Sequence, residues 1–278
     1  PCGCSKEFRG WAVKRMIGTL VANFRVFLII LVRVTALIQV APLFSSQAFP
    51  QTAKLGFALF VSVAIYPWVA EQGYLLPDTA VDYFLTVVGE AMIGIILGFF
   101  LNIIFAVFQV AGQFFSLQMG FGASQVFDPL AQIQIPLMGQ FLNIAGMFTF
   151  LVISGAQKLL LVGVYGSFKS IRAVDLVARR AALFPLFLRS LGDLFVNSLT
   201  ISFPILGTLL LISVTMGLLA KAAPQMNLLM MGFPVAIGTA LLVIAAATPF
   251  LIGAFSRLLD GGFEQLGTII TILRGAEG

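Results

Sequence analysis

The chain has 278 residues, of which 60% are hydrophobic and 10% are charged, whereas ordinary soluble domains carry about 25% charged residues. It contains no histidine and only two cysteines, so the Ser–His and Cys–His pairs of nucleophilic catalysis cannot be built. The formal charge of +5 comes mainly from two basic segments, 1–25 and 158–193, which is the pattern of cytoplasmic loops. We therefore expect a polytopic membrane protein without catalytic activity, metal, cofactor or nucleic-acid partner.

The N-terminal stretch is expected to be an addition to the domain. It precedes Met16, which begins a segment that would serve as a natural start. Its Cys2-Gly-Cys4 motif lacks the further ligands of a zinc site. We predict that residues 1–15 form a non-native or disordered extension and that residues 16–278 form one helical membrane domain.

Hydropathy divides the domain into six apolar segments, several of which reach the ~20 residues of a spanning helix. In chain order they are about 26–44, 53–70, 84–111, 135–157, 199–220 and 227–255. Pro67 beside Trp68 predicts the end of the second segment, since proline breaks helices. Six full crossings from a cytoplasmic N-terminus would place the basic segment 158–193 inside, but also the acidic connector 71–82. We therefore expect some segments to depart from simple crossings.

Glu90 lies inside the third apolar segment, where a carboxylate costs about 2.5–3.5 kcal/mol on insertion scales and should face protein or water. It is either a proton or ion site, or a structural carboxylate that pairs with a helix N-terminus or with an Arg or Lys of a neighbour. A proton relay needs further titratable groups, and the sequence offers only Arg33 as a comparable group, so we favour the structural interpretation. Gly94 and Gly98 follow at small-xxx-small spacing, which lets two helices approach closely.

Residues 111–129 form an unusual block, AGQFFSLQMGFGASQVFDP, whose single charge is Asp128. The block is too polar to face lipid and too rich in Phe and Met to be an ordinary loop. Irregular backbone at membrane depth is tolerated only where protein buries it or where it lines a cavity. We therefore expect either a deformable seal around a passage, built from Met and Phe, or a re-entrant hairpin that packs in a bundle. Composition leaves both open.

A second unusual spot is Pro224-Gln-Met-Asn, which lies between the last two apolar segments. Pro224 predicts a helix end, and Gln225 and Asn227 can bond the backbone groups freed there. Pro234 is expected to kink or restart the next helix. The spot is either a tight helical hairpin or a corner where a partner docks.

These motifs, in this order and spacing, resemble one family. They are Ala41-Pro-Leu-Phe, Glu90-Ala-Met-Ile-Gly-Ile-Ile-Leu-Gly-Phe, Ala111-Gly-Gln, Gln118-Met-Gly-Phe, Phe127-Asp-Pro, Pro224-Gln-Met-Asn and Gly232-Phe-Pro. Each motif alone is weak, but together, over about residues 20–272, they resemble the FliR family of flagellar export-gate proteins. The virulence counterparts of that family are the SctT proteins.

The resemblance implies a non-enzymatic role in protein export from the bacterial inner membrane, at the flagellar basal body. It implies an all-α fold of bent helical hairpins, like a FliP-like unit fused to a FliQ-like unit. The implied partners are FliP-like, FliQ-like, FlhB-like and FlhA-like proteins and the unfolded flagellar subunits that pass the gate. An injectisome counterpart is the first alternative. A proton-coupled small-molecule transporter that uses Glu90 is a more distant one.

The resemblance also implies roles for particular residues. A loop that helps to plug the closed pore maps to about 111–127 of this sequence. The residues assigned to the seal are Phe114, Phe115, Met119 and Phe121, and those that let it bend are Gly112, Gly120 and Gly122. The residues assigned to subunit packing are Glu90, Gly94, Gly98, Asp128, Pro129, Pro224, Gln225 and Asn227.

Overall fold

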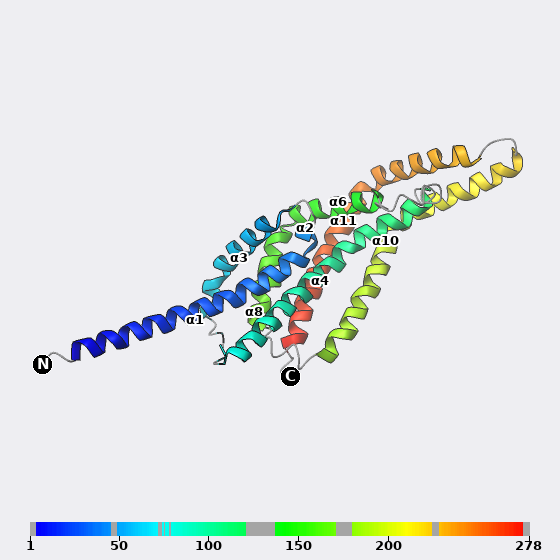
Figure 1. Cartoon of the computed structure of the whole chain (residues 1–278). Helices are drawn as coiled ribbons and strands as arrows, with labels where there is room; N and C mark the ends of the chain where they lie inside the picture. Colours follow the sequence, from blue (N-terminus) through cyan, green and yellow to red (C-terminus); the bar gives the residue numbers. More distant parts are fainter. Residues whose placement is uncertain are drawn as a thin grey trace. The chain divides into compact units, whose positions relative to one another are not determined.

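The structure is a computed structural model, and every regular element in the part of the chain that it describes is a helix (Figure 1). The described residues are 4–45, 49–71, 74, 76–77, 79–120, 137–170, 180–223 and 228–274. The helices are α1 (Cys4–Val40), α2 (Pro42–Ser45), α3 (Gln51–Glu71), α4 (Ala80–Gln118), α6 (Leu137–Val152), α7 (Gly155–Lys158), the π-helix η2 (Leu159–Tyr165), α8 (Gly166–Ser170), α10 (Arg180–Ala222) and α11 (Leu228–Arg274). The predicted all-α fold is confirmed, whereas the likeness to a fused FliP-like and FliQ-like unit stays a prediction.

Each of the six apolar segments has a helical counterpart. In the part of the chain that the structure describes, five helices are long and apolar enough to cross a membrane, or six if a bent pair is counted as one span. Several helices are longer than the segments that hydropathy marked. α4 has 39 residues and α10 has 43, against the ~20 that a bilayer requires. α10 begins at Arg180, so the charged stretch before the apolar segment is helical as well.

The chain divides into two compact units. The first unit comprises residues 1–101, 159–184 and 266–278, and the second comprises 102–158 and 185–265. α4 and α11 each contribute to both units. The predictions of an N-terminal extension and of a single domain stay predictions.

In the first unit, α3 lies beside α1 (Figure 1). Aromatic pairs link α3 to α2 at one end of this contact and to α1 at the other. The rings of Phe44 and Phe57 have centroids 5.1 Å apart near the α2 turn, and those of Phe27 and Tyr66 are 6.3 Å apart. The prediction that Pro67 ends this segment is wrong, because α3 continues to Glu71. Its buried face extends past the proline, so packing outweighs the loss of one backbone hydrogen bond.

A cluster of phenylalanine rings forms the centre of the second unit. Phe108 of α4 and Phe255 of α11 have ring centroids 4.4 Å apart, and Phe105 of α4 and Phe150 of α6 are 5.6 Å apart. Such pairs contribute about 0.5–1.5 kcal/mol each beyond the area they bury. This contribution matters in a membrane, where lipid is as apolar as the side chains and helix association depends on packing.

The fourth apolar segment is sharply bent. α6 ends at Val152, and the helical stretch that begins at Gly155 is tilted by 75° from it. Ser154 lies at the break with φ 57°, and its carbonyl oxygen accepts hydrogen bonds from the backbone of Gln157 and Lys158. This bend is the kind of departure from a simple crossing that the topology argument predicted.

Candidate functional site: a buried arginine network and the end of α4

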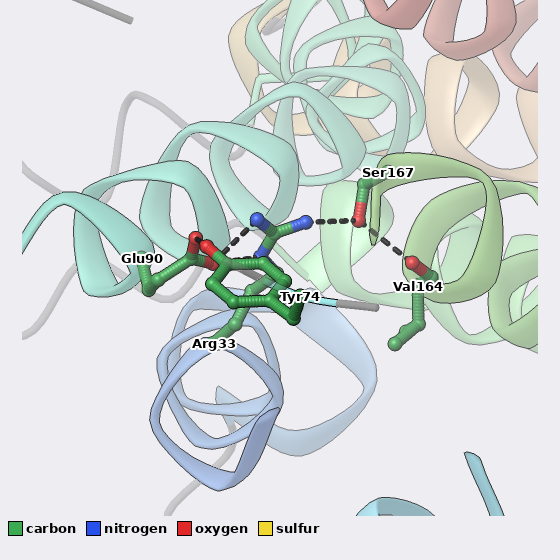
Figure 2. A network of polar contacts seen from close by, with 5 residues as sticks. All are labelled: Arg33, Tyr74, Glu90, Val164 and Ser167. Atoms are coloured by element: carbon green, nitrogen blue, oxygen red, sulfur yellow. Dashed lines mark hydrogen bonds and ion pairs between the residues drawn. The ribbon is translucent and has the colours of Figure 1, made fainter. Parts of the chain in front are cut away.

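The first unit brings one charged pair together in its interior (Figure 2). Arg33 belongs to α1 and Glu90 to α4, and their side chains are 1% and 0% exposed. α4 comes this close because Gly94 packs against the backbone carbonyl oxygen of Arg33, where a Cβ atom would clash. Gly98 extends the contact, since a Cβ there would lie 2.9 Å from the carbonyl oxygen of Leu37. The close approach is thus made within the chain, and a role of both glycines between subunits stays a prediction.

Both oxygens of the Glu90 carboxylate have donors. Nε of Arg33 donates to Oε2 at 2.5 Å, and another guanidinium nitrogen forms an ion pair with the same oxygen. The hydroxyl of Tyr74, in the connection between α3 and α4, donates to Oε1 (Figure 2). Removing an ion from water costs several kcal/mol, so a buried pair persists only where its remaining polar atoms are also satisfied. Tyr74 supplies that additional bond.

The far side of the guanidinium faces the start of α8. Nη1 of Arg33 donates to Oγ of Ser167 at 3.1 Å, and this hydroxyl donates to the carbonyl oxygen of Val164 at 2.7 Å (Figure 2). Val164 lies in η2, where the π-helical hydrogen-bond pattern changes to the α pattern of the next element. The ring centroid of Phe168 lies 3.8 Å from Cζ of Arg33, so the cation also contacts an aromatic face.

The network joins elements that are distant in sequence rather than presenting reactive groups. Arg33 links α1 to α4 through Glu90 and to α8 through Ser167. Among the described residues no three His, Cys, Asp or Glu side chains gather as metal ligands. The geometry supports the structural interpretation of Glu90, with Arg33 as its partner, while the assigned role of Glu90 in subunit packing stays a prediction.

Sequence reasoning recognised only part of this network. Arg33 and Glu90 can be recognised because each is a charged residue within an apolar segment. Tyr74 lies within the acidic connector 71–82, where a tyrosine carries no distinctive signal, and a single serine such as Ser167 gives none in an apolar sequence. Phe168 is one of 28 phenylalanines, so its position over the cation could not be anticipated.

The second candidate region is the C-terminal end of α4, where the sequence predicted irregular backbone. That prediction is wrong for residues 111–118, because α4 continues unbroken to Gln118. Ala111, Phe115 and Met119 recur at helical spacing and are each 0% exposed. A buried apolar stripe therefore outweighs the local excess of Gln, Ser and Gly.

Two glycines of this region have different structural roles. Gly112 packs against α6, where a Cβ atom would lie 2.5 Å from the backbone nitrogen of Gly139. Gly120 has φ 91°, a conformation that favours glycine, and the ring of Phe233 occupies the space that a Cβ atom would take. In this structure Gly112 thus permits a helix crossing, and Gly120 is the position at which the chain turns.

The remaining assigned residues are distributed as follows. Phe114 is half-buried, whereas Phe115 and Met119 are buried within the chain. α10 ends at Ala222, which agrees with the helix end predicted before Pro224. Pro234 lies inside α11, which begins at Leu228, so it does not restart the helix. Seven assigned residues lie outside the described ones: Phe121, Gly122, Asp128, Pro129, Pro224, Gln225 and Asn227.

The sequence matches known proteins over most of its length. A family model, Bacterial export proteins, family 1, matches residues 24–262. The chain is 32% identical over 247 residues to the flagellar biosynthetic protein FliR of Borreliella burgdorferi. The matched region covers 87% of this chain and 90% of that protein. It is 29% identical over 243 residues to FliR of Bacillus subtilis, with 85% and 92% covered. It is 30% identical over 247 residues to FliR of Escherichia coli, with 87% and 92% covered. The chain therefore belongs to the FliR family of bacterial export proteins.

Proposed function

We propose that this chain is a non-enzymatic subunit of the flagellar type III protein-export gate in the bacterial inner membrane. The observation that carries the proposal is the family match over residues 24–262, together with relatives from three bacteria that are named flagellar biosynthetic proteins. These relatives are matched over about nine-tenths of their own length, so the likeness extends beyond a shared fragment. The apolar helices support a place within the membrane.

In this proposal the chain acts by assembly with FliP-like and FliQ-like subunits, next to FlhB-like and FlhA-like proteins. Unfolded flagellar subunits pass through the assembled channel. The distribution of burial supports a role in an assembly. In the most apolar part of α4, 56% of the residues are buried within the chain. In the corresponding parts of α10 and α11, only 11% and 17% of the residues are buried. α4 therefore serves as an internal helix, while α10 and α11 have apolar surface that lipid or other subunits can cover.

The proposed seal begins where α4 ends. Phe115 and Met119 are buried against their own chain and would anchor the base of the seal, while Phe114 is half-buried beside them. The left-handed turn at Gly120 releases the chain from the helix direction. Phe121, with Gly122 as a bending point, would then supply the part that moves when a substrate passes. Contacts with neighbouring subunits are part of the same proposal, and the residues assigned to them are Glu90, Gly94, Gly98, Asp128, Pro129, Pro224, Gln225 and Asn227.

The experiment that tests this function is purification of the tagged chain from membranes of its own bacterium, at native expression and in mild detergent. We expect FliP-like and FliQ-like proteins to co-purify in fixed proportion, and an unrelated tagged membrane protein of similar abundance to bring down neither. Recovery of the chain without either protein, although the FliP-like and FliQ-like proteins are present in the same membranes, would contradict the proposal. Co-purification with an injectisome set instead would favour the virulence alternative.

A further inference from the structure

α10 and α11 line a groove in the second unit, at residues that the proposed seal and subunit contacts do not include. The groove consists of two adjoining cavities of about 100 and 240 Å³ that share Asn197, Arg257 and Leu258. The floor of the first cavity is apolar and comes from α4, through Ile103 and Val107. The groove therefore combines an apolar base with charged and amide side chains at its rim.

The chemistry of the groove changes in a fixed order along the helices. One end is formed by Asp193, whose carboxylate accepts a hydrogen bond from Nε2 of Gln265 at 3.3 Å. Arg257 follows in the middle, and the second cavity is lined by apolar groups such as Ile201 and Phe250. α10 rises about 12 Å between Asp193 and Ile201. A negative group, a positive group and an apolar channel thus follow one another.

The groove lies at the end of the uncharged stretch of each helix. Residues 194–220 of α10 and 228–256 of α11 contain no Asp, Glu, Lys or Arg. Each stretch rises about 40 Å, more than the roughly 30 Å of a bilayer core. Asp193 and Arg257 are the first charges beyond these stretches, where lipid headgroups lie.

Arg257 is available for a ligand. Its side chain is exposed, and among the described residues it has no carboxylate within ion-pair distance. Asp260, one turn further along α11, pairs with Lys158 instead, with 2.5 Å between Nζ and Oδ1. Arginine is well suited to phosphate because its planar fork can donate two parallel hydrogen bonds.

We infer that this groove binds one phospholipid whose zwitterionic headgroup ends in a primary ammonium, such as phosphatidylethanolamine. The ammonium donates to Asp193, the phosphate accepts from Arg257 and Asn197, and an acyl chain lies along Ile201 and Phe250. This order matches the order of the groove, because the amine of such a lipid lies outermost and the acyl chains lie innermost. An anionic headgroup would leave Asp193 without a positive partner, and a choline headgroup has no N–H group to donate.

The test is native mass spectrometry of the full-length chain in detergent, with phosphatidylethanolamine, phosphatidylglycerol and phosphatidylcholine added in equal amounts. We expect phosphatidylethanolamine to be retained preferentially. Arg257→Gln should lower retention of all three lipids by roughly tenfold, the loss of one hydrogen bond to a charged group. Asp193→Asn should remove the preference for phosphatidylethanolamine over phosphatidylglycerol, and Asp193→Lys should reverse it. Equal retention of the three lipids by the unmodified chain would overturn the inference.

Matched variants separate lipid recognition from misfolding. Arg189→Gln removes an exposed cation of α10 that does not line the groove, and should leave retention unchanged. Arg257→Lys keeps the charge and should retain more lipid than Arg257→Gln. Helicity by circular dichroism should be the same in all variants. A photo-reactive amino acid in place of Ala254 should capture lipid in native membranes. Capture of protein alone would overturn the inference, because a partner would then fill the groove.

Discussion

Nε of Arg33 and Oε2 of Glu90 lie 2.5 Å apart, and neither side chain is more than 1% exposed. A buried ion pair of this kind is weak evidence for high stability, because desolvation offsets much of the attraction. It is costly to break, however, since the remaining charge has no water around it. The pair therefore fixes α1 against α4, and Ser167 extends this constraint to α8.

We predict that removing one member of the pair is far more damaging than removing both. Glu90→Ala should lower the free energy of unfolding by about 3–5 kcal/mol, because it leaves the Arg33 cation buried without its carboxylate. The double variant Arg33→Met with Glu90→Met should recover most of that loss. Unfolding of the detergent-solubilised chain, followed by circular dichroism, measures both.

The matched control is the pair of Lys158 and Asp260, whose side chains are 42% and 48% exposed. Its removal by Asp260→Ala should cost at most about 1 kcal/mol, since solvent screens exposed pairs. If Glu90→Ala cost no more than Asp260→Ala, the account of the buried network would be refuted.

Ser167 should contribute more than an ordinary buried serine. Ser167→Ala removes the acceptor of Arg33 Nη1 and the donor to the carbonyl oxygen of Val164, so we expect a loss of about 1–3 kcal/mol in unfolding free energy. Ser202 is equally buried, but its hydroxyl donates to the carbonyl oxygens of Ser198 and Leu199 in its own helix. Ser202→Ala should therefore be nearly neutral, and equal losses at the two serines would argue against a tie between α1 and α8.

Gly112 is expected to tolerate no side chain. Gly112→Ala would place its Cβ atom 2.5 Å from the backbone nitrogen of Gly139, so α4 and α6 must move apart. We expect a loss of about 1–3 kcal/mol, the usual range for overpacking. Gly207 of α10 has no atom within 4 Å of the corresponding Cβ position, so Gly207→Ala should instead add about 0.5–1 kcal/mol through helix propensity. Thermal unfolding of both variants checks the sign difference, and a stabilising Gly112→Ala would contradict the close crossing.

The seal makes a prediction about membrane permeability. Deleting residues 121–127 from the chain in its assembled gate should let small ions leak, because the bulky residues beyond Gly120 are removed while α4 is kept intact. A Gly-Ser replacement of equal length should leak as well, which separates the bulk of the side chains from the length of the loop. Ion flux into membrane vesicles measures the effect. Unchanged permeability in both variants would exclude the seal.

The fold class followed from the sequence because it depends on features averaged over many residues. Hydropathy marked all six apolar segments, and the small-xxx-small spacing of Gly94 and Gly98 indicated a close helix contact. Helix ends were harder to predict from the sequence. Pro67 and the Gln-rich end of α4 both carry local signals against helix, but in each case a buried stripe continues and packing prevails.

The candidate site was predictable only in its charges. A charged residue in an apolar segment needs a partner, which directed attention to Arg33 and Glu90. Tyr74 and Ser167 contribute through a contact at long sequence separation, and neither residue type is unusual where it stands. Such partners depend on which helices meet, and that is a property of the folded chain.

The central claim, that the chain works in flagellar protein export, is tested most directly by measuring flagellar subunits secreted into the medium by its own bacterium. We predict that deleting the gene abolishes secretion while the subunits still accumulate inside the cell. The unmodified chain supplied from a plasmid should restore secretion. Undiminished secretion of flagellar subunits in the deletion strain would contradict the account.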